Sequence, residues 1–567
     1  MPTITCSLRD LNRLVGTEIT VARLEKEILL VKGELKGYDR AADELKIELQ
    51  DTNRPDLWTV EGIARQLRYA LTDNPPKYAW YSDETLPLVG DMIVHAGLDY
   101  RPYAGAIAVR GVEVTDTFLI GLIQTQEKLA DNLGRYRKSL SIGIYDLNQI
   151  TFPVHYKPVD REGIRFVPLE FQREMTPDEI LREHPKGQMY AGILEGRNPV
   201  PILMDEAGVV MSFPPIINSR ASGEVKVGKR DLFIEATGTD FMHMILALNI
   251  FAADLADRGA EIGAVRVRFD VETPYGRDII MPLPVQQKTR ISRTMVKNWL
   301  GADFDADRMS ELLEKYGYAI ETRHEDADEI EVVMPPWRQD LLHPVDVIED
   351  LAISAGYDSF EAEMPGYFTV GKVDPAVSFE DRIRDTILPF GYEEVISNIL
   401  CSREEFSAMV REPDRELVEI ANPMNIKFAA LRDRILPSLL RVERDSSQAL
   451  YPHRIFETGE VTVHDADTDT GCRTRRRLAV LVADREAEFA HVHACLEALL
   501  NSLGLTAVIR AEDIPVFIPG RSGRIEVADR PIGWMGEMHP EVLENYEITM
   551  PCAAYEIDLD ILKQLIG

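Results

Sequence analysis

The alternation of apolar and polar positions divides the chain into four stretches. In the first, residues 1–75, Val21–Val31 and Val60–Leu71 have the spacing of amphipathic helices, and Leu45–Leu49 alternates as a strand does. The prolines within residues 73–77 cannot continue a helix, so a linker follows. This order of short helices and strands predicts a small N-terminal α/β module.

The second stretch, residues 90–275, is rich in strand signals. Ala106–Val114 alternates along its length, and turn residues recur as far as the pair Pro214–Pro215. Between these, Lys128–Lys138 has the composition of a basic helix. We predict a compact mixed α+β domain for this stretch.

The last two stretches are predicted from helix and strand patterns together. Residues 276–357 contain a β-run at Glu329–Met334 and two short helices, which indicates a small domain. Residues 365–567 mix strands such as Arg477–Val482 with amphipathic helices such as Phe489–Leu503. The whole chain is therefore expected to be a multidomain α+β protein.

Composition narrows the class of protein. The chain has 567 residues with 45% hydrophobic and 28% charged content, which is ordinary for globular proteins. The longest strongly apolar uncharged run, Phe241–Ala253, is too short to span a membrane. Five scattered cysteines form no Cys-x-x-Cys pair, which is typical of a reduced cytosolic protein without a thiolate zinc site.

The net charge of −32 is the unusual number. A chain that bound a nucleic-acid backbone over most of its surface would be expected to carry a net positive charge. Solubility, or adaptation to a salty cytoplasm, explains the acidity. Any contact with RNA must then be local, and the basic residues Arg135, Arg137 and Lys138 are candidates for such a patch.

An acidic set stands near the end of the third stretch. Pro344 suits the first turn of a helix, on which Asp346, Glu349 and Asp350 share one face, with Asp340 just upstream. Converging carboxylates are the oxygen ligands that Mg²⁺ or Ca²⁺ take. Spacing alone leaves a second reading open, in which acidic residues favour the helix dipole and form a solvated face.

A second candidate site lies in the strand-rich stretch. Asn218 follows the Pro-Pro turn, and Glu235 and Thr237 alternate on a predicted strand, so the three could line a small pocket. A turn-rich β domain explains the same residues without a ligand. The chain has no Gly-x-x-x-x-Gly-Lys-Ser/Thr, Gly-x-Gly-x-x-Gly or Gly-x-Ser-x-Gly motif, because its two Gly-x-x-x-x-Gly-Lys runs are followed by Arg230 and Val373, so no common nucleotide or hydrolase signature applies.

Taken in order along nearly the whole chain, several motifs resemble the β-subunit family of phenylalanyl-tRNA synthetases in its archaeal/eukaryotic form. They are Asn53-Arg-Pro-Asp56, Arg101-Pro-Tyr103, Ile142-Gly-Ile-Tyr-Asp146, Pro214-Pro-Ile-Ile-Asn218, Thr237-Gly-Thr239, Trp337-Arg-x-Asp340, Asp346-x-x-Glu349-Asp350, Asn422-Pro423, Phe456-Glu-x-Gly459 and Gly536-Glu-x-His539-Pro540. No single motif decides the matter, but their sequence order is specific.

The resemblance implies four domains. These are an N-terminal α/β module (1–75), a mixed α+β tRNA-editing domain (90–275), a small helical or winged metal-binding domain (276–357) and a class II synthetase-like antiparallel-sheet domain (365–567). It also implies that Asp340, Asp346, Glu349 and Asp350 are Mg²⁺ ligands.

The implied partner is an α subunit, in an (αβ)₂ heterotetramer that attaches phenylalanine to tRNA(Phe) while ATP becomes AMP and diphosphate. The aminoacylation site is expected in the α subunit, because this chain lacks the Gly-x-Gly-x-x-Arg segment with which a class II site holds ATP. The expected location is the cytoplasm.

The resemblance also suggests a purpose for the pocket. An apolar site for phenylalanine rejects tyrosine only about 10²-fold, so a second, hydrolytic site restores accuracy. We expect Asn218, Glu235 and Thr237 to line it, with Glu235 accepting a hydrogen bond from the tyrosine hydroxyl. Two other hypotheses remain: an autonomous aminoacyl-tRNA deacylase, and a non-catalytic metal-dependent scaffold.

Overall fold

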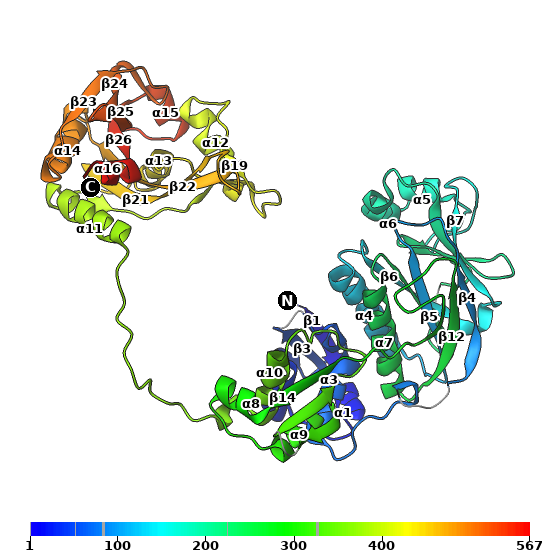
Figure 1. The fold of residues 1–567 in the computed structure, drawn as a ribbon. Helices are drawn as coiled ribbons and strands as arrows, with labels where there is room; N and C mark the ends of the chain where they lie inside the picture. The colour runs from blue at the N-terminus through cyan, green and yellow to red at the C-terminus, as the bar shows by residue number, and fades with distance from the viewer. Residues whose placement is uncertain (1, 51–52, 82–85, 224, 325–327, 567) are drawn as a thin grey trace. The chain divides into compact units, whose positions relative to one another are not determined.

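The computed structural model describes residues 2–50, 53–81, 86–223, 225–324 and 328–566. They form two compact units, residues 1–364 and 365–567 (Figure 1). Each unit combines β-sheets with helices, so the multidomain α+β class is confirmed. Within the described ranges, every helix is too short or too polar to cross a membrane.

The first unit begins with a three-stranded antiparallel sheet in the order β1-β3-β2. Its elements are β1 (Thr3–Ser7), α1 (Leu8–Val15), α2 (Val21–Glu27), β2 (Gly33–Asp39), β3 (Glu44–Leu49) and α3 (Val60–Leu71). The predicted strand at 45–49 and helix at 60–71 are confirmed. The Thr59 hydroxyl caps α3 by accepting from the Gly62 N–H at 2.8 Å.

The next part of this unit is a ten-stranded mixed sheet in the order β10-β9-β8-β7-β4-β12-β5-β11-β6, with β13 paired to β12. Its strands are β4 (Leu88–Val94), β5 (Tyr103–Arg110), β6 (Leu140–Asp146), β7 (Val154–Val159), β8 (Val200–Met204), β9 (Val210–Phe213), β10 (Ile217–Asn218), β11 (Leu232–Gly238), β12 (Glu261–Phe269) and β13 (Asp278–Met281). Its helices include α4 (Asp116–Lys128), α5 (Pro177–Glu183), α6 (Pro185–Tyr190) and α7 (Phe241–Asp257).

The predicted strand Ala106–Val114 is placed correctly but ends early. β5 stops at Arg110, and Gly111 turns the chain with φ 76°. Residues 104–109 are all buried, and α7 packs against β5 and the neighbouring strand β11. The alternation therefore does not separate a core face from a solvent face here.

The predicted basic helix Lys128–Lys138 is wrong. Helix α4 ends at Lys128 and continues as a π-helical turn, Leu129–Leu133. The next residues, Arg135, Tyr136 and Arg137, have φ values of 50°, 54° and 63°. This left-handed conformation costs roughly 1–2 kcal/mol per non-glycine residue, so distant contacts must hold it.

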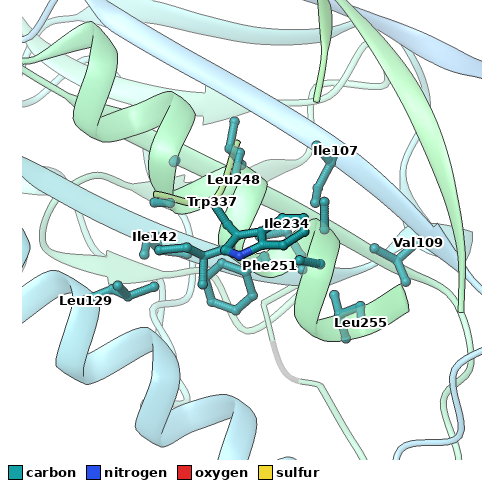
Figure 2. Packing of buried hydrophobic residues seen from close by; sticks show 14 of the residues in the cluster. Ile107, Val109, Leu129, Ile142, Ile234, Leu248, Phe251, Leu255 and Trp337 are labelled. Atoms are coloured by element: carbon teal, nitrogen blue, oxygen red, sulfur yellow. The ribbon is translucent and has the colours of Figure 1, made fainter. Parts of the chain in front are cut away.

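The third part of this unit is a small sheet, β14-β16-β15, with three helices. Its elements are β14 (Lys288–Ser292), α8 (Arg293–Leu300), α9 (Ala306–Glu314), β15 (Ala319–His324), β16 (Glu329–Val333) and α10 (Pro344–Ala355). The predicted β-run and the helix that Pro344 begins are confirmed. Just before α10, Trp337 lies in the same buried cluster as Leu248 and Phe251 of α7 (Figure 2).

The second unit is built on a seven-stranded sheet in the order β17-β21-β22-β26-β25-β24-β23, antiparallel except between β17 and β21. Its strands are β17 (Glu393–Glu394), β21 (His453–His464), β22 (Cys472–Ala483), β23 (Ala507–Ala511), β24 (Phe517–Val527), β25 (Arg530–Met538) and β26 (Cys552–Asp558). Its helices are α11 (Pro375–Ile387), α12 (Arg403–Phe406), α13 (Leu436–Asp445), α14 (Phe489–Ser502), α15 (Pro540–Asn545) and α16 (Leu559–Ile566). A small sheet, β18 (Leu400–Cys401), β20 (Ala430–Leu431) and β19 (Val418–Glu419), completes it.

Candidate functional site

A cavity of about 370 Å³ lies in the ten-stranded sheet region, between α4, strand β6 and the turn that joins β9 to β10. Its apolar wall includes Leu119, Leu122, Ile142, Ile144, Phe213 and Ile216. That volume is at the lower end of ordinary small-ligand sites. The cavity is thus suited to a side chain or another small, partly apolar group.

Glu235 supplies the buried charge in this wall. It sits in β11 with 2% of its surface exposed, and the phenol of Tyr145 donates a hydrogen bond to its Oε1 at 3.0 Å. Among the described residues, its other oxygen, Oε2, has no hydrogen-bond partner. A buried acceptor without a partner is costly unless a ligand or water satisfies it, so this oxygen is the natural contact for a bound donor.

Burial raises the pKa of Glu235 to about 7, although the Tyr145 hydrogen bond and the Arg101 charge both act to lower it. The same burial raises the pKa of Tyr145 well above its usual value. Tyr145 therefore remains a phenol that donates, while the charge of Glu235 changes near neutral pH.

Gly143 makes room for this pair. It lies opposite Glu235 in the pairing of β6 with β11. A Cβ atom at this position would come within 2.2 Å of Tyr145 Oη and 2.5 Å of Glu235 Oε1. Only glycine at position 143 leaves room for Tyr145 of β6 and Glu235 of β11 to form their hydrogen bond.

The predicted pocket residues divide into two groups. Asn218 and Glu235 line the cavity, and Asn218 Oδ1 is 3.5 Å from Tyr145 Oη. Thr237 is fully buried and does not line the cavity; its hydroxyl lies 2.9 Å from that of Ser141, which does. The structure therefore brings two of the three residues to the cavity and places the third behind its wall.

Sequence reasoning missed Tyr145 and Arg101 as parts of this site. Ser141, Gly143 and Tyr145 alternate along β6 and so face the same side, a signal that could have indicated Tyr145. Arg101 is 1% exposed, and its Nη2 donates to the Ser141 hydroxyl at 2.8 Å and to the Thr237 carbonyl at 2.7 Å. No local pattern indicates these distant partners.

The acidic set of the third part is divided between different partners. Arg338 donates to both carboxylate oxygens of Asp340, at 3.0 and 2.7 Å, and to Asp350 at 2.7 Å. Asp350 also accepts from the phenol of Tyr318 at 2.6 Å. Burial would raise the pKa of Asp340, but the neighbouring Arg338 and Arg54 charges hold it at about 2.

The other two carboxylates lie elsewhere on the start of α10. Asp346 caps the helix by accepting from the N–H groups of Leu342 and His343 at 2.8 and 2.7 Å. Glu349 is half exposed and lies 3.2 Å from the ammonium of Lys32. Over the ranges that the structure describes, no group of three or more histidine, cysteine or acidic side chains is arranged to hold a metal ion. The donor chemistry suits Mg²⁺, but this arrangement does not assemble it into a ligand set.

Two family models match the chain, and both describe parts of tRNA synthetases. Residues 289–357 match the tRNA synthetase B5 domain. Residues 361–559 match the phenylalanyl tRNA synthetase beta chain CLM domain. The class of protein is therefore an aminoacyl-tRNA synthetase subunit.

Relatives that match over their full length show which kind of synthetase subunit this chain resembles. The chain is 37% identical to the phenylalanine–tRNA ligase β subunit of Thermococcus sibiricus, covering 99% of this chain and 98% of that one. It is 36% identical to the β subunits of Borrelia recurrentis and Pyrococcus horikoshii, covering 99% of each chain. A crystal structure of an N-terminal fragment of the Pyrococcus horikoshii β subunit aligns with a TM-score of 0.58 and 34% identity, over 63% of this chain and all of the fragment. The chain belongs to the family of phenylalanine–tRNA ligase β subunits.

Proposed function

We propose that this chain, within the ligase, binds and hydrolyses tRNA(Phe) mischarged with tyrosine at the cavity that Glu235 lines. The observation that supports this most directly is the unpartnered, buried Oε2 of Glu235 in the wall of a small, partly apolar cavity. A tyrosine side chain offers an apolar ring for the wall and a hydroxyl that can donate to this oxygen. Phenylalanine fills the same space but leaves the oxygen without a partner.

The hydrogen bond to Glu235 would provide the selectivity for tyrosine over phenylalanine. A site that hydrogen-bonds a substrate hydroxyl rejects the analogue without it by about 10⁴–10⁵-fold, because a buried polar group is then left unpaired. The aminoacylation site discriminates much less well in the other direction, because an apolar pocket for phenylalanine rejects the added hydroxyl of tyrosine only about 10²-fold. A second site that selects the hydroxyl therefore corrects the error that the first site makes.

Glu235, Tyr145 and Asn218 act as binding and orienting groups in this proposal. The Tyr145 phenol holds one oxygen of Glu235, so the other is presented to the substrate hydroxyl. The oxygen of a water molecule attacks the acyl carbon of the ester. The bond between this carbon and the ribose oxygen breaks, and the ribose oxygen takes up the proton that the water loses. The free amino acid and intact tRNA(Phe) are the products.

For the assembled enzyme, we propose an (αβ)₂ heterotetramer in the cytoplasm, in which the α subunit carries the site for ATP and phenylalanine. The antiparallel sheet of residues 365–567 would serve assembly as a class II synthetase-like domain. The expected role of Asp340, Asp346, Glu349 and Asp350 in holding Mg²⁺ stays untested, and it would require Asp340 and Asp350 to exchange their hydrogen bonds with Arg338 for the ion.

The experiment compares Glu235→Gln and Glu235→Ala with the wild type in the α–β complex. Both variants should slow hydrolysis of tyrosyl-tRNA(Phe) at least tenfold, while the rate of phenylalanine charging stays within about twofold. Wild-type hydrolysis rates in both variants would remove Glu235 from the site. Equal hydrolysis by this chain without the α subunit would favour the autonomous deacylase instead.

A further inference from the structure

The left-handed turn Arg135–Arg137 joins the cavity to a second hollow. Three consecutive non-glycine residues have φ values of 50–63° there. Backbone strain of this kind persists only where surrounding contacts enforce it, and it concentrates at binding sites. The strained turn is therefore a candidate part of a binding site.

The buried Arg101 stabilises the left-handed turn by hydrogen bonds. Its Nη1 donates to the carbonyl oxygens of Arg137 and Lys138, both at 3.2 Å. Its remaining donors hold Ser141 and Thr237, beside the cavity wall. One buried guanidinium thus supports the turn and the strands behind the cavity.

Arg137 attaches the turn to the cavity itself. Its Nη1 donates to the carbonyl oxygens of Pro215 and Ile216 at 3.3 and 3.0 Å, and its guanidinium lies 4.5 Å from the centre of the Tyr190 ring. The side chain also lines the cavity. Of the three basic residues expected to contact RNA, Arg137 is thus directed into the protein.

The residues next to Arg137 are exposed to solvent. Tyr136 has 70% of its surface exposed, and Arg135 and Lys138 are also exposed. Tyr136, Arg135 and Lys128 line a wider, open hollow that does not include Arg137. The left-handed turn thus presents an aromatic ring and a cation next in sequence to Arg137, which lines the smaller cavity.

We propose that Tyr136 and Arg135 form a subsite for the single-stranded 3′ end of the RNA whose aminoacyl group enters the cavity. This inference rests on the proposed editing function. An exposed aromatic ring stacks on any base, and a neighbouring guanidinium pairs with the phosphate. On a chain of net charge −32, such a contact has to be local, and this turn supplies it next to the cavity.

The test uses the α–β complex and measures KM and kcat for hydrolysis of tyrosyl-tRNA(Phe). Tyr136→Ala should raise KM about tenfold and change kcat less than about twofold, because stacking contributes to binding and not to the reacting atoms. Tyr136→Phe should restore the wild-type KM. Tyr357→Ala, which removes another exposed tyrosine of the first unit, is the matched control and should have no effect.

Two further measurements make the result decisive. Arg135→Gln should reduce the slope of log KM against log salt concentration by about one. A tRNA(Phe) with 8-azidoadenosine at its 3′ terminus should crosslink to the peptide that contains Tyr136, a readout that does not depend on hydrolysis. Melting temperatures of all variants verify that they fold.

The outcomes separate this inference from the proposed function. If Glu235→Gln abolishes hydrolysis while Tyr136→Ala keeps the wild-type KM and the crosslink falls elsewhere, the subsite is overturned and editing stands. If Glu235→Gln hydrolyses normally, editing at this cavity is overturned, and the crosslink decides the subsite by itself.

Discussion

The guanidinium of Arg338 donates to Oδ2 of Asp350 at 2.7 Å, and both side chains are almost completely buried. The same guanidinium holds Asp340, whose Oδ1 is 4.0 Å from Nε of Arg54. Residues from the N-terminal part and from the α10 region therefore share one ion-pair network. Two of the four predicted metal ligands, Asp340 and Asp350, are partners of Arg338 in this network, and a third, Glu349, pairs with Lys32 outside it.

This network predicts a large loss of stability when Arg338 is removed. Arg338→Met should lower the free energy of unfolding of the first unit by about 3–5 kcal/mol, because it leaves the buried Asp350 without a counter-charge and Asp340 with only the more distant Arg54. Urea denaturation followed by circular dichroism measures the change. Arg308→Met is the matched control: its exposed pair with Glu311 should contribute nothing measurable. Equal denaturation midpoints for the two variants would contradict a structural role for the network.

The response to Mg²⁺ is the second prediction. We expect millimolar Mg²⁺, or its removal by EDTA, to leave the melting temperature of the isolated chain unchanged, because Arg338 and Lys32 already pair with three of the four carboxylates. Differential scanning calorimetry checks this. A rise in melting temperature that Asp346→Asn abolishes would show instead that the carboxylates rearrange around the ion.

Glu235 predicts a specific pH dependence of stability. Its pKa is raised from an ordinary value of 4.5 to about 7, so the folded chain binds more protons than the unfolded chain between these pH values. The stability it contributes is therefore complete below about pH 4.5 and is lost as the pH rises through 7. Relative to the wild type, Glu235→Gln should gain about 3 kcal/mol between pH 4.5 and pH 8. Urea unfolding at both pH values measures the difference, and parallel stability curves would contradict the raised pKa.

Gly143 provides a test of cavity geometry. Gly143→Ala should abolish hydrolysis of tyrosyl-tRNA(Phe), because the new methyl group would force Tyr145 and Glu235 apart. The assay is deacylation by the α–β complex. Gly121→Ala in α4 is the matched control and should deacylate at the wild-type rate, because apart from the adjacent residues and the helix's own backbone no described atom lies within 4 Å of the added Cβ. Normal hydrolysis by Gly143→Ala would place the reactive pocket elsewhere.

Local patterns predicted the regular elements well. Helix α3 runs from Val60 to Leu71 as its apolar spacing indicates, and α10 begins at Pro344 as expected. The helix prediction for Lys128–Lys138 was wrong because the residue types of this segment are compatible with a helix that the structure does not form. Its left-handed turn depends on carbonyl contacts with Arg101, more than thirty residues away.

The sequence by itself determined the α+β class, the family through its ordered motifs, and the placement of Asp346, Glu349 and Asp350 on one helix. These depend on residue identity and on spacing along the chain. Only the tertiary structure decided that Glu235 is paired with Tyr145, 90 residues away, and that Arg338 lies between Asp340 and Asp350. The physical reason is that charge state and hydrogen bonding depend on which groups surround a side chain and on how much water they exclude, and spacing along the chain carries neither.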